Sequence, residues 1–239
     1  MTITAKIGSL SATMLIAMVA ATLNGGCSSS SSPADAPTDS GAAVPDDAGG
    51  VSPDADFDSA PKGCVYPAGP YGITPGKVLN PNLQWQGFAP GATTASTVKI
   101  TDLYDCDGSK GINAFVIDSA GQWCVACQYV AQDIPTWFSP TGDDWTKLGI
   151  QILTLVIQNN NYEPATITTA QQWRSLFKLT DIYVVADPAD TFPTTSLPYE
   201  LLVDPRTMKI TMDISEDTTL NKDGSDPNVT ALAKKNGAK

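Results

Sequence analysis

The chain of 239 residues contains no histidine. Imidazole is the general base of Ser-His-Asp and Cys-His catalysis, and it is the commonest side-chain ligand of protein metal sites. The composition therefore excludes both kinds of catalysis, together with every metal site that needs imidazole.

Basic residues are also scarce, with 14 Lys and Arg against 25 Asp and Glu and a formal net charge of −11. Nucleic acids and anionic lipid head groups attract positive protein surfaces rather than negative ones. The balance argues against a nucleic-acid partner and against charge-driven binding to anionic lipids. Residues 28–60 alone hold seven Asp and no Lys or Arg.

The first 26 residues have the pattern of a signal peptide. Lys6 precedes an uncharged stretch, residues 7–23, that is rich in Ala, Leu, Met and Val. That stretch is interrupted by Gly and Ser and is short for a transmembrane span, so we interpret it as a signal sequence.

Residues 23–27, Leu-Asn-Gly-Gly-Cys, resemble a bacterial lipobox. In that motif the cysteine is lipidated and becomes the mature N-terminus, which here implies a lipid anchor on Cys27. Ser28 after it resembles the outer-membrane sorting class. We expect an extracytoplasmic protein anchored in a bacterial membrane, facing the periplasm or the cell surface; a plain secretory signal is the alternative.

Residues 27–62 consist mainly of Ser, Pro, Ala, Gly and Asp. So few apolar side chains cannot bury a core, and the acidic charges repel one another, which predicts a disordered and extended tether. The rest of the chain suits one domain with a sizeable core. We place that domain at residues 63–222 and treat 223–239 as a tail or weak helix.

A C-x-x-C motif, Trp123-Cys124-Val125-Ala126-Cys127, follows the apolar residues 114–117. At a strand-to-helix turn the first cysteine lies at the helix N-terminus, where free N–H groups and the helix dipole favour a thiolate. The second cysteine lies one helical turn away, within reach of a disulfide. The spacing also occurs in zinc knuckles, but this context favours thiol chemistry.

Hydrophobic patterns predict seven strands and two helices. Alternating strands and helices indicate βαβ units with right-handed crossovers, hence an α/β fold with a mixed sheet. The last two strands are expected to form an antiparallel hairpin at one side. The strands are expected at 83–88, 97–100, 112–118, 150–157, 182–185, 201–203 and 208–212; one helix is expected from Cys124 to a stop near Pro135, and another opens at a Thr168/Gln171 capping box.

Over residues 80–215, the motif and this element order resemble the thioredoxin-like superfamily, and most nearly its extracytoplasmic redoxin-domain members. The resemblance implies a three-layer α/β fold with a mixed central sheet flanked by helices. It implies that Cys124 attacks a substrate disulfide and that Cys127 resolves the mixed disulfide. Trp123 is expected to shield one side of the thiol pair and to shape the substrate-docking surface.

Asp118 precedes Cys124 by six residues. The resemblance implies that a buried acid at this spacing helps to deprotonate the resolving cysteine. A carboxylate in an apolar strand should have its pKa raised by desolvation, which suits a proton acceptor near neutral pH. The alternative is an ordinary Asp at a strand end that binds a turn.

Pro198 lies just before the expected terminal hairpin. The resemblance implies a cis-proline that packs against the C-x-x-C and lets the preceding backbone pair with a substrate peptide. Leu197 stands before it, where Thr or Val is more usual, so it is expected to affect substrate preference. A trans proline in a loop is the alternative, and Pro193 is a weaker competitor for the role.

In an oxidising compartment, Cys64 and Cys106 are expected to form a structural disulfide. The alternatives are that one of them relays electrons to Cys127, or that all four cysteines of the domain bind zinc, which the context of Cys124 and Cys127 makes unattractive. No metal and no cofactor are expected.

These features predict an extracytoplasmic thiol–disulfide oxidoreductase that acts on protein substrates and is recharged by an unknown redox partner protein. A peroxiredoxin is disfavoured, because Gly121 stands three residues before Cys124, where that family has Thr or Ser. The runner-up is a tethered, non-catalytic binding or structural module whose C-x-x-C has become a structural disulfide.

Overall fold

A computed structural model describes residues 63–139, 144–215 and 227–238. The predicted signal peptide, the lipidation site Cys27 and the tether at 27–62 lie outside the described residues. None of the described helices has the length and apolar character needed to cross a membrane.

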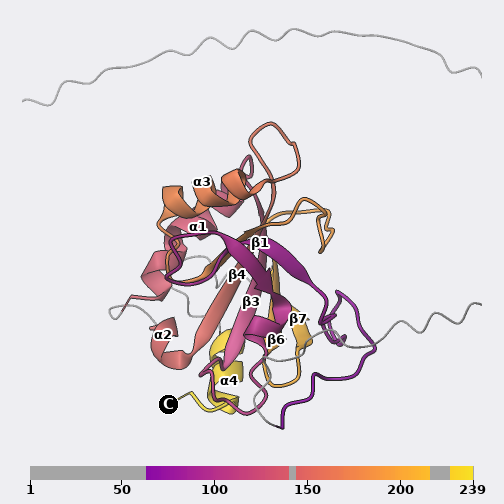
Figure 1. Ribbon diagram of the computed structural model, residues 1–239. Helices are drawn as coiled ribbons and strands as arrows, with labels where there is room; N and C mark the ends of the chain where they lie inside the picture. The colour runs from indigo at the N-terminus through magenta and orange to yellow at the C-terminus, as the bar shows by residue number, and fades with distance from the viewer. Residues whose placement is uncertain (1–62, 140–143, 216–226, 239) are drawn as a thin grey trace, which may run out of the picture. The chain divides into compact units, whose positions relative to one another are not determined.

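The described chain forms a seven-stranded sheet in the order β2-β1-β5-β4-β3-β6-β7 (Figure 1). Strand β4 pairs in parallel with β3 and β5, and all other pairs are antiparallel. The predicted α/β class, with a mixed sheet and an antiparallel hairpin at one edge, is confirmed. The strands are β1 (Gln84–Phe88), β2 (Ser96–Lys99), β3 (Ala114–Gly121), β4 (Ile150–Gln158), β5 (Tyr183–Ala186), β6 (Tyr199–Asp204) and β7 (Lys209–Asp213).

Four α-helices pack on one face of this sheet, which we call the helical face. Each helix buries an apolar stripe, as expected of amphipathic surface helices. One buried cluster joins Val130 of α1, Trp145 of α2, Trp173 of α3 and Val229 of α4 to the sheet. The helices are α1 (Val125–Trp137), α2 (Trp145–Leu148), α3 (Ile167–Phe177) and α4 (Pro227–Lys235).

The C-terminal helix α4 is packed into the folded domain. Val229 and Ala233 are fully buried, and the Asn236 side chain donates hydrogen bonds to the Asn113 carbonyl and the Asp204 carboxylate. The segment expected as a tail or weak helix thus contributes core residues, and the folded unit extends past residue 222.

The opposite face of the sheet is covered by irregular chain and by the short 3₁₀ helix η1 (Ile100–Leu103). Leu79, Leu103 and Phe192 are buried there against the sheet. Side chains of a strand alternate between faces, so β3 sends Phe115 and Ile117 to this side. Val116 and Ala120 point to the helical face, where the cysteine pair also lies.

The prediction that the first helix stops near Pro135 is wrong, because α1 continues to Trp137 with Pro135 inside it. A proline in a helix costs up to about 3 kcal/mol. Trp137 is 1% exposed and packs on Trp145 with ring centroids 5.1 Å apart. Burial of ~200 Å² of a tryptophan contributes on the order of 5 kcal/mol, which outweighs that cost.

The predicted capping box of α3 is also wrong. The N-cap is Thr166, whose hydroxyl accepts from the Thr169 N–H, while the Thr169 hydroxyl accepts from the Thr166 N–H. A threonine at the third helical position therefore does the work that the sequence rule assigns to Glu or Gln, and Thr168 with Gln171 does not form the box. The apolar face predicted for this helix is buried, with Ala170, Trp173 and Phe177 in the core.

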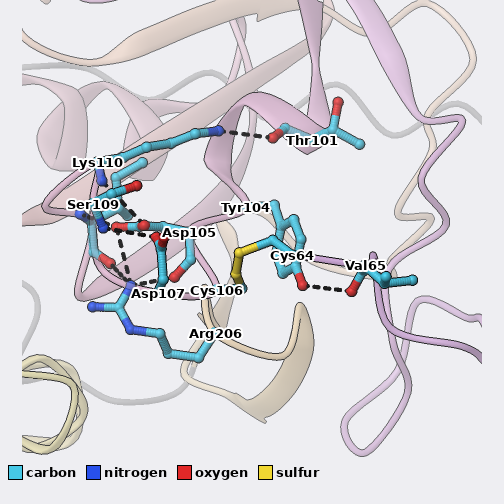
Figure 2. The surroundings of a disulfide bond; sticks show 11 residues. Cys64, Val65, Thr101, Tyr104, Asp105, Cys106, Asp107, Ser109, Lys110 and Arg206 are labelled. Carbon is cyan, nitrogen blue, oxygen red and sulfur yellow. Dashed lines mark hydrogen bonds and ion pairs between the residues drawn. A yellow bond between two sulfur atoms is a disulfide. The ribbon is translucent and has the colours of Figure 1, made fainter. Parts of the chain in front are cut away.

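A disulfide joins Cys64 to Cys106 and fastens the segment before β1 to the turn before β3 (Figure 2). Their Cα atoms are 5.9 Å apart and 42 positions separate them in the sequence. Beside it, the Tyr104 hydroxyl donates to the Val65 carbonyl at 2.7 Å. Closing a loop of this length contributes about 4 kcal/mol in the chain-entropy account.

Next to this disulfide, an ion pair between the partly buried Arg206 and the buried Asp105 ties the β6–β7 turn to the segment before β3. Arg206 Nη1 lies 3.1 Å from the carboxylate of Asp105, which is fully buried. The same carboxylate accepts from the backbone N–H groups of Lys110 and Ile112, and Arg206 also donates to the Asn236 carbonyl. Figure 2 shows Asp105, Lys110 and Arg206 in this arrangement.

Candidate redox site

The turn between β3 and α1 is held by hydrogen bonds within the turn and to Gln158 on the neighbouring strand β4. The Cys124 N–H donates to the Gly121 carbonyl, and the Gln122 N–H donates to the Gln158 carbonyl on β4. The Trp123 indole N–H donates to the Gln158 side chain at 2.9 Å. A Cβ on Gly121 would lie 2.9 Å from that indole nitrogen, so glycine allows the ring to pack back over the turn.

Cys124 and Cys127 are joined by a disulfide, with Cα atoms 5.3 Å apart. Cys124 is the N-cap of α1, and its sulfur accepts a hydrogen bond from the Cys127 N–H at 3.1 Å. On reduction, this N–H and the helix N-terminus would stabilise a thiolate at Cys124. The sequence prediction thus placed the pair at the correct end of the correct helix.

The two cysteines differ little in exposure, at 6% for Cys124 and 2% for Cys127. The residues around them are much more open, since Val125 is 60% exposed and Tyr129, one helical turn further on, is 64% exposed. The small exposed surface of the Cys124 sulfur therefore lies beside more exposed apolar side chains.

Trp123 packs against Tyr162, with ring centroids 4.9 Å apart. Tyr162 is 64% exposed and has a left-handed backbone, φ +62°. Its loop is held by Asn159, whose side chain accepts from the N–H groups of Asn161 and Glu163. Sequence reasoning missed Tyr162, because nothing local in the sequence connects it with Trp123.

Asp118 lies within β3 and not at a strand end or in a turn. It is 4% exposed; one carboxylate oxygen accepts from the Thr154 hydroxyl at 3.0 Å, and the other has no hydrogen-bond partner among the described residues. Desolvation raises the pKa of Asp118 to about 6, and the Thr154 hydrogen bond opposes this rise. By strand alternation it shares the helical face with Ala120 and Cys127.

The Leu197–Pro198 peptide bond is cis, and Pro198 directly precedes β6. Leu197 is partly buried and packs against the core cluster that contains both Cys124 and Cys127. Leu197, which was predicted to lie on the substrate-docking surface, is therefore packed against the same cluster as the cysteine pair.

A second buried acid was missed. Glu200 on β6 is 4% exposed and pairs directly with Asp118 in the sheet. The available sequence signal was a single charged residue inside the otherwise apolar stretch 199–203, immediately after Pro198.

Among the described residues, one group has three metal-ligand atoms within 4.8 Å of one another, namely Cys64, Cys106 and Asp107. Its two sulfurs are bonded to each other, and a metal ligand must be a thiolate. Cys124 and Cys127 do not belong to this group.

No protein-family model and no curated protein matches the chain. Solved structures do match it, including a thiol:disulfide interchange protein from Bacteroides sp. (15% identity, TM-score 0.42, 62% of this chain and 87% of that one). Others are a secreted thiol-disulfide isomerase from Corynebacterium glutamicum (12%, 0.40, 62% and 83%) and AhpC from Enterococcus faecalis (10%, 0.44, 66% and 92%). With TM-scores below 0.5, these matches do not decide the activity of this chain.

Proposed function

We propose that this protein is a thiol–disulfide oxidoreductase of the thioredoxin-like superfamily that exchanges disulfides with protein substrates through Cys124 and Cys127. The observation that carries the proposal is the disulfide at the N-terminus of α1, with the Cys127 N–H directed at the Cys124 sulfur. The buried carboxyl of Asp118 on the same face of the sheet supports it.

In the reducing direction, the Cys124 thiolate attacks one sulfur of a substrate disulfide, and the other substrate sulfur leaves as a thiolate. Cys127 then gives its thiol proton to the Asp118 carboxylate, and its sulfur attacks the Cys124 sulfur of the mixed disulfide. The second substrate sulfur leaves and takes up the proton from Asp118. The substrate gains two electrons and the Cys124–Cys127 pair loses them; the oxidising direction is the reverse.

The proposed substrates are polypeptides, which would dock on the apolar surface formed by Trp123, Val125, Tyr129 and Tyr162. We further propose that the domain works outside the cytoplasm, anchored in a bacterial membrane through lipidated Cys27 and carried on the tether at 27–62. A partner redox protein would return the pair to its working state.

The test is the reduction potential of the Cys124–Cys127 pair in the full chain, measured by equilibration with glutathione or dithiothreitol. Cys124→Ser is the control, because it keeps the Cys64–Cys106 disulfide and removes the exchanging pair. A potential near −270 mV indicates a reductase, and one near −120 mV indicates an oxidant. A folded protein whose pair does not equilibrate with either thiol contradicts the proposal.

The low exposure of Cys124, 6%, favours a second candidate, a tethered binding or structural module whose C-x-x-C is a structural disulfide. One experiment, the trapping of a mixed disulfide, distinguishes the two candidate functions. An oxidoreductase forms a trapped mixed disulfide with a reactive protein disulfide when Cys127→Ser leaves Cys124 as the free nucleophile, whereas a structural module does not.

A further inference from the structure

The two disulfides of the domain lie beyond opposite ends of β3 and pack against opposite faces of the sheet. Cys64 and Cys106 pack against the cluster on the face without the α-helices, whereas Cys124 and Cys127 belong to the helical-face cluster. Cys106 precedes β3 and Cys124 follows it, so the eight residues of this strand, roughly 25 Å in length, lie between them. A direct relay of electrons from Cys64 or Cys106 to Cys127 therefore does not fit this structure.

The Cys64–Cys106 bond is still within reach of thiols from other molecules, because both cysteines are only partly buried. Exchange begins when a thiolate attacks one sulfur; the electron pair of the S–S bond then goes to the other sulfur, which leaves as a thiolate. A fixed negative charge beside the bond opposes both the approach of the attacking group and the departure of the leaving group.

Asp107 places such a charge beside this disulfide. Its carboxylate oxygen lies within 4.8 Å of both sulfur atoms (Figure 2). The Ser109 N–H donates to the carboxylate at 3.0 Å, and hydrogen bonds from the backbone and the side chain of Ser109 lower the pKa of Asp107. The carboxylate is therefore charged throughout the pH range in which thiols react.

The positive groups drawn beside Asp107 in Figure 2 have other partners. Arg206 forms the ion pair with Asp105, and the Lys110 ammonium group donates to two backbone carbonyls of η1. Burial raises the pKa of Tyr104, whose ring lies beside the disulfide, and the negative charge of Asp107 raises it further. A new negative charge is thus disfavoured on this side of the disulfide as well.

We propose that Asp107 protects the Cys64–Cys106 disulfide from attack by thiolates, most strongly from those that carry further negative charge. Asp107 acts on the rate of exchange, because it repels the attacking thiolate and the thiolate that would leave. The attacking groups that it repels include glutathione and the reactive cysteine of another copy of the chain. This inference goes beyond the proposed function, since it concerns the disulfide that does not take part in the exchange.

The test compares thiols of different charge on the full chain. Cysteamine brings an ammonium group with its thiolate, whereas glutathione brings additional carboxylates. Opening of Cys64–Cys106 is followed by alkylation and peptide mapping, and each rate is divided by the thiolate concentration. Asp107→Asn keeps an oxygen that can accept from Ser109 and removes the charge. It should accelerate opening by glutathione at least about threefold and opening by cysteamine less. Asp181→Asn, at an exposed acid elsewhere, should change neither rate.

A second measurement needs only the wild type. Raising sodium chloride from about 0.01 M to about 1 M shortens the Debye length from about 30 Å to about 3 Å. Opening of Cys64–Cys106 by glutathione should then accelerate at least about threefold. An unchanged rate overturns the proposal, and so does a slower one, which would show that the positive charge of Arg206 dominates at the sulfurs. A folded Asp107→Asn variant that opens at the wild-type rate also overturns it.

The same peptide maps report the Cys124–Cys127 pair separately, so the failure of this inference and that of the proposed function are distinguishable. If Cys124–Cys127 opens and Asp107→Asn has no effect on Cys64–Cys106, the protection by Asp107 fails and the oxidoreductase proposal stands. If no thiol opens Cys124–Cys127 while Cys64–Cys106 responds to charge and salt as described, the oxidoreductase proposal fails and the protection by Asp107 stands.

Discussion

Two buried aspartates, one next to the Cys64–Cys106 disulfide and one on the same face of the sheet as Cys124 and Cys127, have very different hydrogen-bond and ion-pair partners. Asp105, next to Cys106, is fully buried and is paired with Arg206 and with the backbone N–H groups of Lys110 and Ile112. Asp118, on the same face of the sheet as the Cys124–Cys127 pair, accepts one hydrogen bond from Thr154 and leaves one oxygen without a described partner.

We interpret the first aspartate as structural and the second as one that can exchange a proton. A buried carboxylate that is paired with a cation and accepts hydrogen bonds from backbone N–H groups has its polar atoms satisfied within the fold. A buried carboxyl with one weak donor has its pKa raised, here to about 6 for Asp118, and can gain or lose a proton near neutral pH. The same residue type thus ties loops together next to one disulfide and, in the proposed function, exchanges a proton with the other cysteine pair.

The largest expected effect comes from removing the partner of Asp105 in the ion pair with Arg206. Arg206→Ala should lower the free energy of unfolding by about 3–5 kcal/mol, because it leaves the Asp105 charge buried without its partner. Denaturant unfolding measures the loss. Lys147→Ala, which removes an ion pair between an exposed lysine and the partly buried Asp144, is the control and should cost less than about 1 kcal/mol.

The reduction potential of the Cys124–Cys127 pair should be unchanged in Arg206→Ala under conditions in which the variant is folded. A shifted potential would show that Asp105 and Arg206 influence the redox site, and the contrast between the two acids would not hold.

Asp118→Asn should change how stability depends on pH. Because the pKa of Asp118 lies at about 6 instead of 3.8, the native state binds more protons than the unfolded state between these values. Wild-type stability therefore falls as pH rises from about 4 to 6, by about 3 kcal/mol in all. The variant should lack this fall and be more stable than the wild type at pH 7, although slower in disulfide exchange.

Unfolding in denaturant at pH 4 and pH 7.5 checks this, with Asp181→Asn as an exposed control that should keep the wild-type pH dependence. A wild-type protein that gains stability from pH 4 to 7.5 through Asp118 would show that this acid is stabilised in its charged form, and the expected pH dependence would be wrong.

Local patterns in the sequence were enough to predict much of the fold. The order of the strands and main helices follows from hydrophobic periodicity, and the position of Cys124 follows from the change of period at the end of β3. Asp118 was recognisable because a charged residue stands inside an apolar strand. Each of these signals lies within a few residues of the feature that it predicts.

The missed features depend on contacts between distant segments. Arg206 reaches Asp105 across 101 positions, and the pairing of Glu200 with Asp118 depends on the register of two strands that are 82 positions apart at this pair. Register is set by long-range packing, because a shift of one residue would turn every side chain to the other face. No local pattern contains that information.

The smallest expected effect is a change in the pKa of Asp118. Its Thr154 hydrogen bond lowers the pKa, so Thr154→Val, which keeps the shape and removes the donor, should raise the pKa of Asp118 from about 6 to about 7. Thr154→Ser keeps a hydroxyl and should leave it near 6. Infrared titration of the carboxyl measures both; a lower pKa in Thr154→Val would mean that the Thr154 hydroxyl favours the protonated carboxyl instead of the charged one, which would contradict the hydrogen bond described for this pair.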